Sequence, residues 1–500
     1  MTLATATKQT DKTETASRNL LPLLAGPSVA TLVFFLMPDS LDVDTRTVAA
    51  VACLMAVWWM TEAVPLAVTA LIPVAAFPVL SVADITATTT PYAGSVIFLV
   101  LGGIILGLAA QRWDLHRRVA LRAVLAVGTR PAQIVLGLMC ASAFISMWVS
   151  NTATAVIMVP IGTSILGLIR SLNPELQTPK LTAGVLLGIA YGVTMGSMAT
   201  LIGQPPMALM RAYLDDAHDI QIGFAQWMLV GVPVAVVMLA ATWVILTKLV
   251  FRSEVDEIPG GRELIRAELD SLGPITPQEC RVLVVFALAA FSWIFVPLLA
   301  DISVVADRLP WLARVDDTSV AIVAACLLFI IPRSRQDARP LLTWQETREV
   351  PWGLLILFGG GLTLSAQFVA TGLSDWIGES VSRLDFAPPL VIIGVASLVV
   401  ILLTELTSNT ATAAAFFPIM GAIAVGTGID PLIMTVAITL AVSCAFMLPV
   451  ATPSNSVAFA TGELPIRSMI RAGIWLNIIG LIVTLLTVLT LVPLVFDVSL

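Results

Sequence analysis

An eleven-residue segment, SNTATAVIMVP at 150–160, recurs at 408–418 as SNTATAAAFFP, with seven of its eleven residues unchanged. The copies lie 258 residues apart in a chain of 500, so the simplest interpretation is a protein of two related halves. Each copy places Ser, Asn and Thr side chains inside strongly apolar sequence. Because polar groups are expensive in a bilayer and usually serve function there, the two copies are the first place to look for a binding site.

Composition indicates a polytopic membrane protein. Hydrophobic residues make up 58% of the chain and charged residues only 12%, far more apolar surface than one soluble core can bury. We expect an all-α fold in the cell membrane with about 11 transmembrane helices and two re-entrant helical hairpins.

The distribution of charge predicts the orientation. Basic loops (112–130, 248–281, 333–348 and 467–471) alternate with acidic loops (39–46, 211–219, 301–317 and 374–385). Lys and Arg collect on the cytoplasmic side, so the N-terminus is expected inside and the two halves enter the membrane from opposite sides. This pattern is typical of an inverted-repeat transporter.

The halves divide the chain into predicted regions. These are a cytoplasmic tail (1–19), a first repeat (20–250, with a hairpin at 132–169 and a broken helix at 182–210), a cytoplasmic connector (251–280) and a second repeat (281–500, with a hairpin at 388–426 and a broken helix at 431–460). Charge alone also permits two full spans in place of each hairpin. Polar tips at the reversals favour hairpins, since irregular backbone at membrane depth must face protein or a watery cavity.

The sequence lacks the motifs expected of a membrane enzyme or a nucleic-acid-binding protein. The chain has only two histidines, no HExxH, no GxSxG and no Asp within a predicted span, so a membrane enzyme is not expected. The net charge of −7 is spread over loops and indicates no nucleic-acid partner. An open channel is disfavoured, though weakly, because the two helix breaks are not identical. The five cysteines are expected to be free thiols.

Several motifs resemble the divalent anion/sodium symporter family over nearly the whole chain. They are WWMTEAVP at 58–65, the two Ser-Asn-Thr tips, ATLIGQPP at 199–206 and SCAFMLPVATPSN at 443–455. The resemblance implies a homodimer in which a transport domain moves like an elevator against a scaffold. Homodimerisation rests on this resemblance alone.

The resemblance also implies the binding residues. The first sodium site would use Ser146, Ser150, Asn151 and the backbone near Ala199, and the second Thr404, Thr407, Asn409 and the backbone near Ala451. Substrate carboxylates would meet Asn151, Thr152, Thr200, Asn409, Thr410, Thr452 and Pro453. This chain departs from the family's usual Pro-Pro-Asn by having Met207 after the first break and Ser454 after the second. The change at Met207 puts substrate breadth or the first ion site in question.

The residue types also support binding of an anion together with a cation, independently of the resemblance. All 26 Lys and Arg residues lie in loops or at segment ends, so helix N-termini, neutral donors and bound cations must neutralise an anion. Amide, hydroxyl and carbonyl oxygens suit an alkali ion. Two acids, Glu62 and Glu405, fall within apolar segments. Glu405 could carry protons, shape the second ion site or bond to neighbouring backbone, whereas Glu62 favours a structural role.

The function expected is sodium-coupled symport of C4-dicarboxylates such as succinate, fumarate or malate, with sodium as the coupling ion and no cofactor. The alternatives are a sodium-independent dicarboxylate exchanger, or citrate or sulfate as the main substrate.

Overall fold

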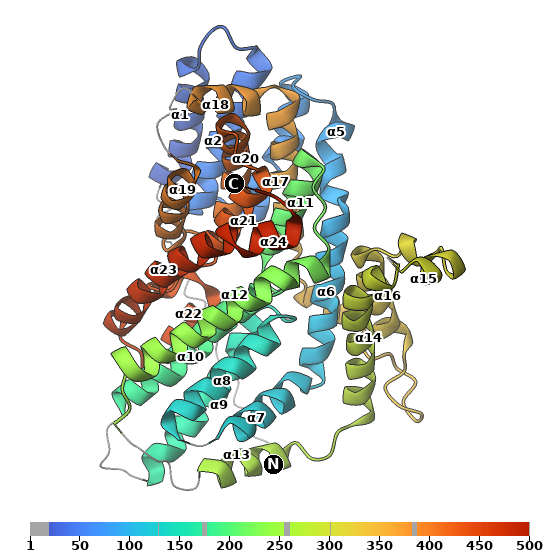
Figure 1. The fold of residues 1–500 in the computed structure, drawn as a ribbon, viewed down its shortest axis with the longest axis vertical. Coiled ribbons are helices and arrows are strands. Elements are labelled where there is room, and N and C mark those ends of the chain that lie inside the picture. The colour runs from blue at the N-terminus through green and yellow to red at the C-terminus, as the bar shows by residue number, and fades with distance from the viewer. Residues whose placement is uncertain are drawn as a thin grey trace, which may run out of the picture.

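The computed structural model describes residues 20–128, 130–172, 178–254, 261–300, 302–382 and 388–499, so the predicted tail at 1–19 lies outside the described residues. Across these ranges the chain is helical, apart from turns and loops and one isolated β-bridge between Pro332 and Pro340 (Figure 1). The five cysteines are free. The prediction of an all-helical polytopic membrane protein is confirmed.

The helices of the first half precede and surround the first hairpin. They are α1 (Leu20–Leu36), α2 (Val43–Thr61), α3 (Leu66–Thr69), α4 (Ile72–Val79), α5 (Ile85–Thr89), the 3₁₀ turn η1 (Thr90–Ala93), α6 (Ser95–Arg112), α7 (Leu115–Val127), α8 (Pro131–Ser146), α9 (Asn151–Leu172), α10 (Pro179–Ser197), α11 (Pro205–His218), α12 (Phe224–Val244) and the π-helical turn η2 (Ile245–Val250).

The remaining elements form the connector and the second half. They are α13 (Gly261–Ser271), α14 (Pro277–Ala300), α15 (Ser303–Arg308), η3 (Leu312–Arg314), α16 (Asp317–Ile330), η4 (Trp344–Glu349), α17 (Trp352–Ala370), α18 (Leu373–Ser382), α19 (Pro389–Thr404), α20 (Asn409–Thr427), α21 (Pro431–Val442), η5 (Pro449–Ala451), α22 (Pro453–Phe459), α23 (Ile466–Leu489) and α24 (Leu491–Phe496).

Seven helical segments of the described residues are long and apolar enough to cross a membrane. They are Val43–Thr61, Ile85–Arg112, Phe224–Val250, Pro277–Ala300, Trp352–Ala370, Asn409–Thr427 and Ile466–Phe496. Shorter apolar helices include the first arm of each predicted hairpin, α8 and α19, with 16 residues each. At 1.5 Å per residue such an arm is about 24 Å long, shorter than the ~30 Å hydrocarbon core. This length suits a segment that enters the membrane and turns back, whereas the second arm of the second hairpin, Asn409–Thr427, is long enough to cross.

The 258-residue offset also relates these hairpin arms. Pro131 and Ser146 bound α8, and the residues 258 positions later, Pro389 and Thr404, bound α19. Proline fits the first helical turn, where its missing N–H is not needed. The helices after the tips, α9 and α20, begin at Asn151 and Asn409 and keep the same offset. The two hairpins lie toward opposite ends of the long axis in Figure 1.

Each hairpin packs against a helix that is interrupted. Helix α10 ends at Ser197 and α11 begins at Pro205, while α21 ends at Val442 and α22 begins at Pro453. We call the intervening stretches, 198–204 and 443–452, the first and second breaks. The incoming helices are buried along nearly their whole length, α10 against α8 and α9 and α21 against α19 and α20. The breaks therefore lie at the ends of the most buried helices.

The two halves interlock at their centre. Helix α22, which follows the second break, packs against α9, and α11, which follows the first break, packs against α20. Helices α12 and α23, which come after the breaks, lie side by side across the middle of the molecule in Figure 1. Each tip helix thus leans on a helix of the opposite half.

The approach of α10 to α8 depends on glycine and provides a test. A Cβ at Gly196 would overlap the backbone of Ala143, whereas a Cβ at Gly184 would meet only Val135 Cγ2 at 3.7 Å. Gly196→Ala should destabilise the protein by about 2 kcal/mol through overpacking. Gly184→Ala, on the same helix, should be neutral or stabilising because alanine is the better helix former. Thermal unfolding of the two purified variants in detergent measures the difference, and equal melting temperatures would contradict the proposed close approach.

Candidate functional site

The same side-chain contact occurs at both tips. Ser146 Oγ donates to Asn151 Oδ1 at 2.8 Å, and Thr404 Oγ1 donates to Asn409 Oδ1 at 2.6 Å. Ser146 and Thr404 are completely buried, and both asparagines are half-buried. Across the described residues neither asparagine donates a hydrogen bond from Nδ2. Each tip therefore pairs two oxygen atoms and leaves an amide donor available.

Serine caps follow the same symmetry. Ser150 Oγ accepts from the N–H of Ala153 at 3.4 Å, and Ser408 Oγ accepts from the N–H of Ala411 at 3.5 Å. These long bonds cap the first turns of α9 and α20 only weakly. Ser150 is exposed, so its oxygen is open to a ligand.

The two tips differ in their surroundings. Thr407 Oγ1 lies 2.7 Å from Thr412 Oγ1 and donates to the Leu403 carbonyl at 2.9 Å. In the first half Thr154, which is 258 residues before Thr412, is buried and its hydroxyl has no partner among the described residues. Position 149 is a valine, so the first half has no counterpart of Thr407. The sodium ligands implied for the two halves are therefore not equivalent.

The first break is joined to the first tip. Thr200 Oγ1 donates to the Met147 carbonyl at 2.5 Å, and both Thr200 and Ala199 are buried. Trp227 Nε1 of α12 donates to the Met198 carbonyl at 3.0 Å. Met207, the departure from the motif that the resemblance implies, is completely buried in α11. The first break is thus fixed from two sides.

The second break has its own internal bonds. Thr452 Oγ1 accepts from the N–H of Asn455 at 3.2 Å and lies 3.0 Å from Ser454 Oγ. Ala451 is buried and Pro453 is exposed. Two contacts join the halves here: Gln204 Nε2 of the first break donates to Ser443 Oγ of the second break at 2.5 Å, and Thr194 Oγ1 of α10 lies 3.1 Å from Ser454 Oγ of α22.

The residues implied for substrate binding fall into two groups in this conformation. Thr152 and Pro453 are exposed and Asn151 and Asn409 half-buried, whereas Thr200, Thr410 and Thr452 are buried. The hydroxyls of Thr200 and Thr452 are already engaged inside the protein. A ligand at these two threonines would require them to exchange partners.

Sequence reasoning left the role of Glu405 open and missed its partners. The Glu405 carboxylate is 2% exposed and accepts from the backbone N–H groups of Phe446, Met447 and Leu448 and from Asn477 Nδ2. Asn477 is the one Asn within the apolar sequence of α23, and this isolated polar residue was the signal that could have pointed to it. Glu62 is exposed at the end of α2, where its φ of 48° is left-handed.

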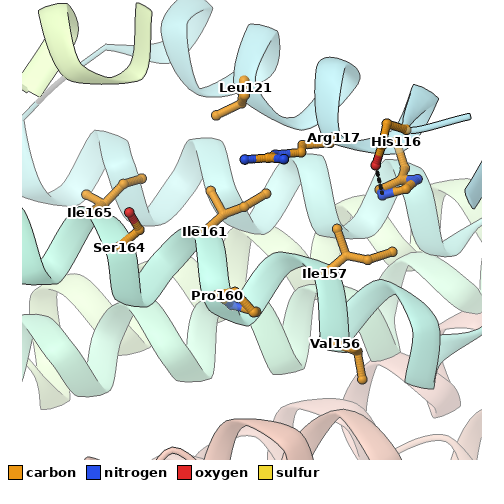
Figure 2. Close-up of a pocket in the computed structure, with 10 residues that line it drawn as sticks. His116, Arg117, Leu121, Val156, Ile157, Pro160, Ile161, Ser164 and Ile165 are labelled. Atoms are coloured by element: carbon orange, nitrogen blue, oxygen red, sulfur yellow. Dashed lines mark ion pairs between the residues drawn. The ribbon is translucent and has the colours of Figure 1, made fainter. Parts of the chain in front are cut away.

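A cavity of about 450 Å3 lies between α7 and α9 (Figure 2). Its wall includes Ile157, Ile161 and Ile165, and it includes no residue of the predicted sites. Thr152, Val156, Pro160 and Ser164 of α9 are exposed at four-residue spacing, so they share one helix face. The cavity therefore lies along the same face of α9 as the first tip.

A histidine lies at one end of this cavity without carrying charge. His116 Nδ1 donates to the Ala110 carbonyl at 3.2 Å, and the side chain is buried. Burial lowers the pKa of His116, so the imidazole is neutral at pH 7 and its 4.0 Å approach to Asp114 is not an ion pair there. The described residues contain no group of three or more His, Cys, Asp or Glu able to hold a metal ion.

Proteins with similar sequences are membrane transporters. The family described as the sodium:sulfate symporter transmembrane region matches residues 17–497. The sodium-dependent dicarboxylate transporter SdcS of Staphylococcus saprophyticus is 38% identical over 493 residues, covering 97% of this chain and 94% of that protein. The transporter of the same name from Staphylococcus aureus is 37% identical over 499 residues, covering 98% and 95%.

Two solved structures share the fold. The Alcanivorax borkumensis YdaH transporter superposes with a TM-score of 0.55 at 16% identity, covering 89% of this chain and 98% of that chain. Neisseria gonorrhoeae MtrF, described with a class of antimetabolite efflux pumps, gives a TM-score of 0.55 at 15% identity and covers 82% and 83%. At this identity the likeness concerns the fold alone.

The match to the family extends from residue 17 to residue 497 and includes both hairpins and both breaks. The chain therefore belongs to the sodium:sulfate symporter family of membrane transporters and is not an enzyme.

Proposed function

We propose that this protein is a secondary active transporter that carries C4-dicarboxylates, such as succinate, fumarate or malate, together with sodium. The carrying observation is the pair of tip contacts, Ser146–Asn151 and Thr404–Asn409, each with an unused amide donor. The relatives named sodium-dependent dicarboxylate transporters, at 37% and 38% identity, support the substrate class and the coupling ion.

The tips suggest how cation and anion are bound together. A hydroxyl oxygen and an amide Oδ1 held within 2.8 Å of each other can both turn toward one sodium ion. The Nδ2 group of the same asparagine then faces a substrate carboxylate. Sodium bound at Oδ1 withdraws electron density from the amide and strengthens its N–H donors. Binding of sodium would therefore build the anion site, and the coupling would be reciprocal.

We further propose that the two halves are inverted repeats and that the hairpins move as part of an elevator-type transport domain in a homodimer. Hairpins at opposite ends of the molecule and breaks at the ends of buried helices support this arrangement. The N-terminus would lie in the cytoplasm, as the loop charges predict.

Uptake into proteoliposomes tests the proposal. Radiolabelled succinate should accumulate in empty vesicles when sodium is present outside, and should not when choline replaces sodium. Uptake that requires internal dicarboxylate and ignores sodium would establish an exchanger instead. Competition by unlabelled succinate, citrate and sulfate identifies the preferred anion, and stronger inhibition by sulfate than by succinate would contradict the dicarboxylate assignment.

Replacing either tip asparagine should abolish coupled transport. Asn151→Ala and Asn409→Ala each remove one oxygen ligand and one anion donor, so we expect the uptake rate to fall by about 100-fold or more, from losses of several kcal/mol at a charged site. The control is Asn19→Ala, in the predicted tail, which should transport normally. Near-normal uptake by either asparagine variant would remove that tip from the site.

Thr152→Val and Thr410→Val should raise the succinate KM more than they raise the sodium concentration for half-maximal uptake.

Water access to the first tip can be measured with cysteine labelling. In a protein whose five native cysteines are replaced by alanine, Thr152→Cys should react with a charged methanethiosulfonate because residue 152 is exposed. Thr154→Cys, two residues along the same helix but completely buried, is the matched control and should react at least about tenfold more slowly, since only an accessible thiolate is the nucleophile. Sodium with succinate should protect Cys at 152, whereas sodium with unrelated neutral solutes should not. Equal labelling of both positions would contradict an open tip.

A further inference from the structure

Glu405 bridges the second tip and the second break. It follows Thr404 directly at the end of α19. Its Oε1 accepts from the N–H of Phe446 at 2.8 Å and of Met447 at 3.0 Å, and its Oε2 from the N–H of Met447 at 3.1 Å and of Leu448 at 3.2 Å. Asn477 Nδ2 of α23 donates to Oε1 at 2.7 Å. One buried carboxylate thus binds three consecutive backbone amides of the break.

Other buried side chains hold the carbonyls of the same stretch. Tyr191 of α10 donates its hydroxyl to the Phe446 carbonyl at 2.8 Å, and Asn455 Nδ2 donates to the Leu448 carbonyl at 3.0 Å. Both side chains are completely buried. The backbone at 446–448 is therefore bound on its N–H and C=O sides, as a non-helical segment inside an apolar interior requires.

The charge of Glu405 is not neutralised by a basic side chain. Every group that bonds to it is a neutral N–H donor, and it joins none of the ion pairs found among the described residues. Consecutive backbone N–H groups offset part of a buried negative charge through their dipoles. A buried carboxylate without a cationic partner nevertheless remains costly, so a cation bound nearby is favoured.

The proposed second cation site begins with the preceding residue, Thr404. Thr404 Oγ1 donates to Asn409 Oδ1 and lies 3.2 Å from the Val442 carbonyl, at the end of α21 that leads into the break. The first half has the neutral Met147 where the second has Glu405. In the first half the link between tip and break is the bond from Thr200 Oγ1 to the Met147 carbonyl, and no carboxylate takes part in it. The two halves therefore share their tip contacts but differ in charge.

We infer that Glu405 is a positioning residue of the second sodium site, which fixes the second break and supplies a negative charge that favours sodium at this site. It acts through Thr404, Asn409 and the break backbone, and the inference assigns it no contact with substrate. The inference rests on the proposed function, since it presupposes sodium at the second tip.

The test is sodium activation of succinate uptake in proteoliposomes, with choline keeping ionic strength constant. Glu405→Gln keeps the size of the side chain and removes its charge, so the sodium concentration for half-maximal uptake should rise by about tenfold or more. The succinate KM at saturating sodium should change by less than about threefold, because substrate donors stay in place. Thermal stabilisation of the purified protein by sodium, measured without substrate, should shift to higher sodium in parallel.

The matched control removes a bond to the same break without changing charge. Tyr191→Phe deletes the hydroxyl that binds the Phe446 carbonyl and should lower thermal stability. Its half-maximal sodium concentration should stay within about twofold of the parent, because the Glu405 charge and its bonds to the break stay in place. If the half-maximal sodium concentration rose as much in Tyr191→Phe as in Glu405→Gln, the role of the Glu405 charge would be overturned.

A second variant decides the question if Glu405→Gln does not fold. Glu405→Asp keeps the charge on a shorter side chain, so sodium activation should stay within about threefold of the parent despite a lower melting temperature. A tenfold rise of the half-maximal sodium concentration in Glu405→Asp would overturn the inference. Unchanged sodium activation in Glu405→Gln overturns it as well and leaves the proposed function standing. Absence of sodium-dependent uptake by the parent protein would overturn both.

Discussion

A backbone that leaves the helix inside an apolar interior must find new partners for its N–H and C=O groups, and this requirement organises the molecule. At the second break the partners are the Glu405 carboxylate, the Tyr191 hydroxyl and the Asn455 amide. At the first break Trp227 binds the Met198 carbonyl, and Thr200 of the break itself binds the Met147 carbonyl at the tip. These partners come from α10, α12, α22 and the end of α19, so satisfying the breaks also fixes the positions of these helices.

The interlocking of the halves follows from the same need. Neither break is enclosed by its own half alone, because Gln204 bonds to Ser443 and Thr194 lies within hydrogen-bonding distance of Ser454. The tip helices α9 and α20 lean on α22 and α11 of the opposite half. A shared centre of this kind suits the proposed carrier, in which sodium and the anion are bound together. The two halves share the contact at the tip, but among the described residues only the second half has a buried carboxylate, Glu405, beside it.

Much of this arrangement could be predicted from local sequence. The repeated segment located both tips, and its offset of 258 residues carried over to the ends of α8 and α19. Pro205 and Pro453 marked where the helices resume after each break. Long-range pairing was beyond reach, since Glu405 and Asn477 are 72 residues apart and no pattern within α23 specifies which acid its Asn meets. The inward use of the Thr200 hydroxyl was missed for the same reason, because its acceptor is a backbone carbonyl that sequence does not distinguish.

The contact between α9 and α22 has a consequence for biosynthesis. Helix α9 is made early, but the helix that covers it spans Pro453–Phe459, near the end of the chain. While the ribosome completes the intervening residues, the polar tip of the first hairpin has only part of its final surroundings. The nascent first half must therefore wait in an incomplete state, held by lipid, by the translocation machinery or by its own early helices. Final docking of the first hairpin then becomes one of the last events of folding, although its residues are among the earlier ones synthesised.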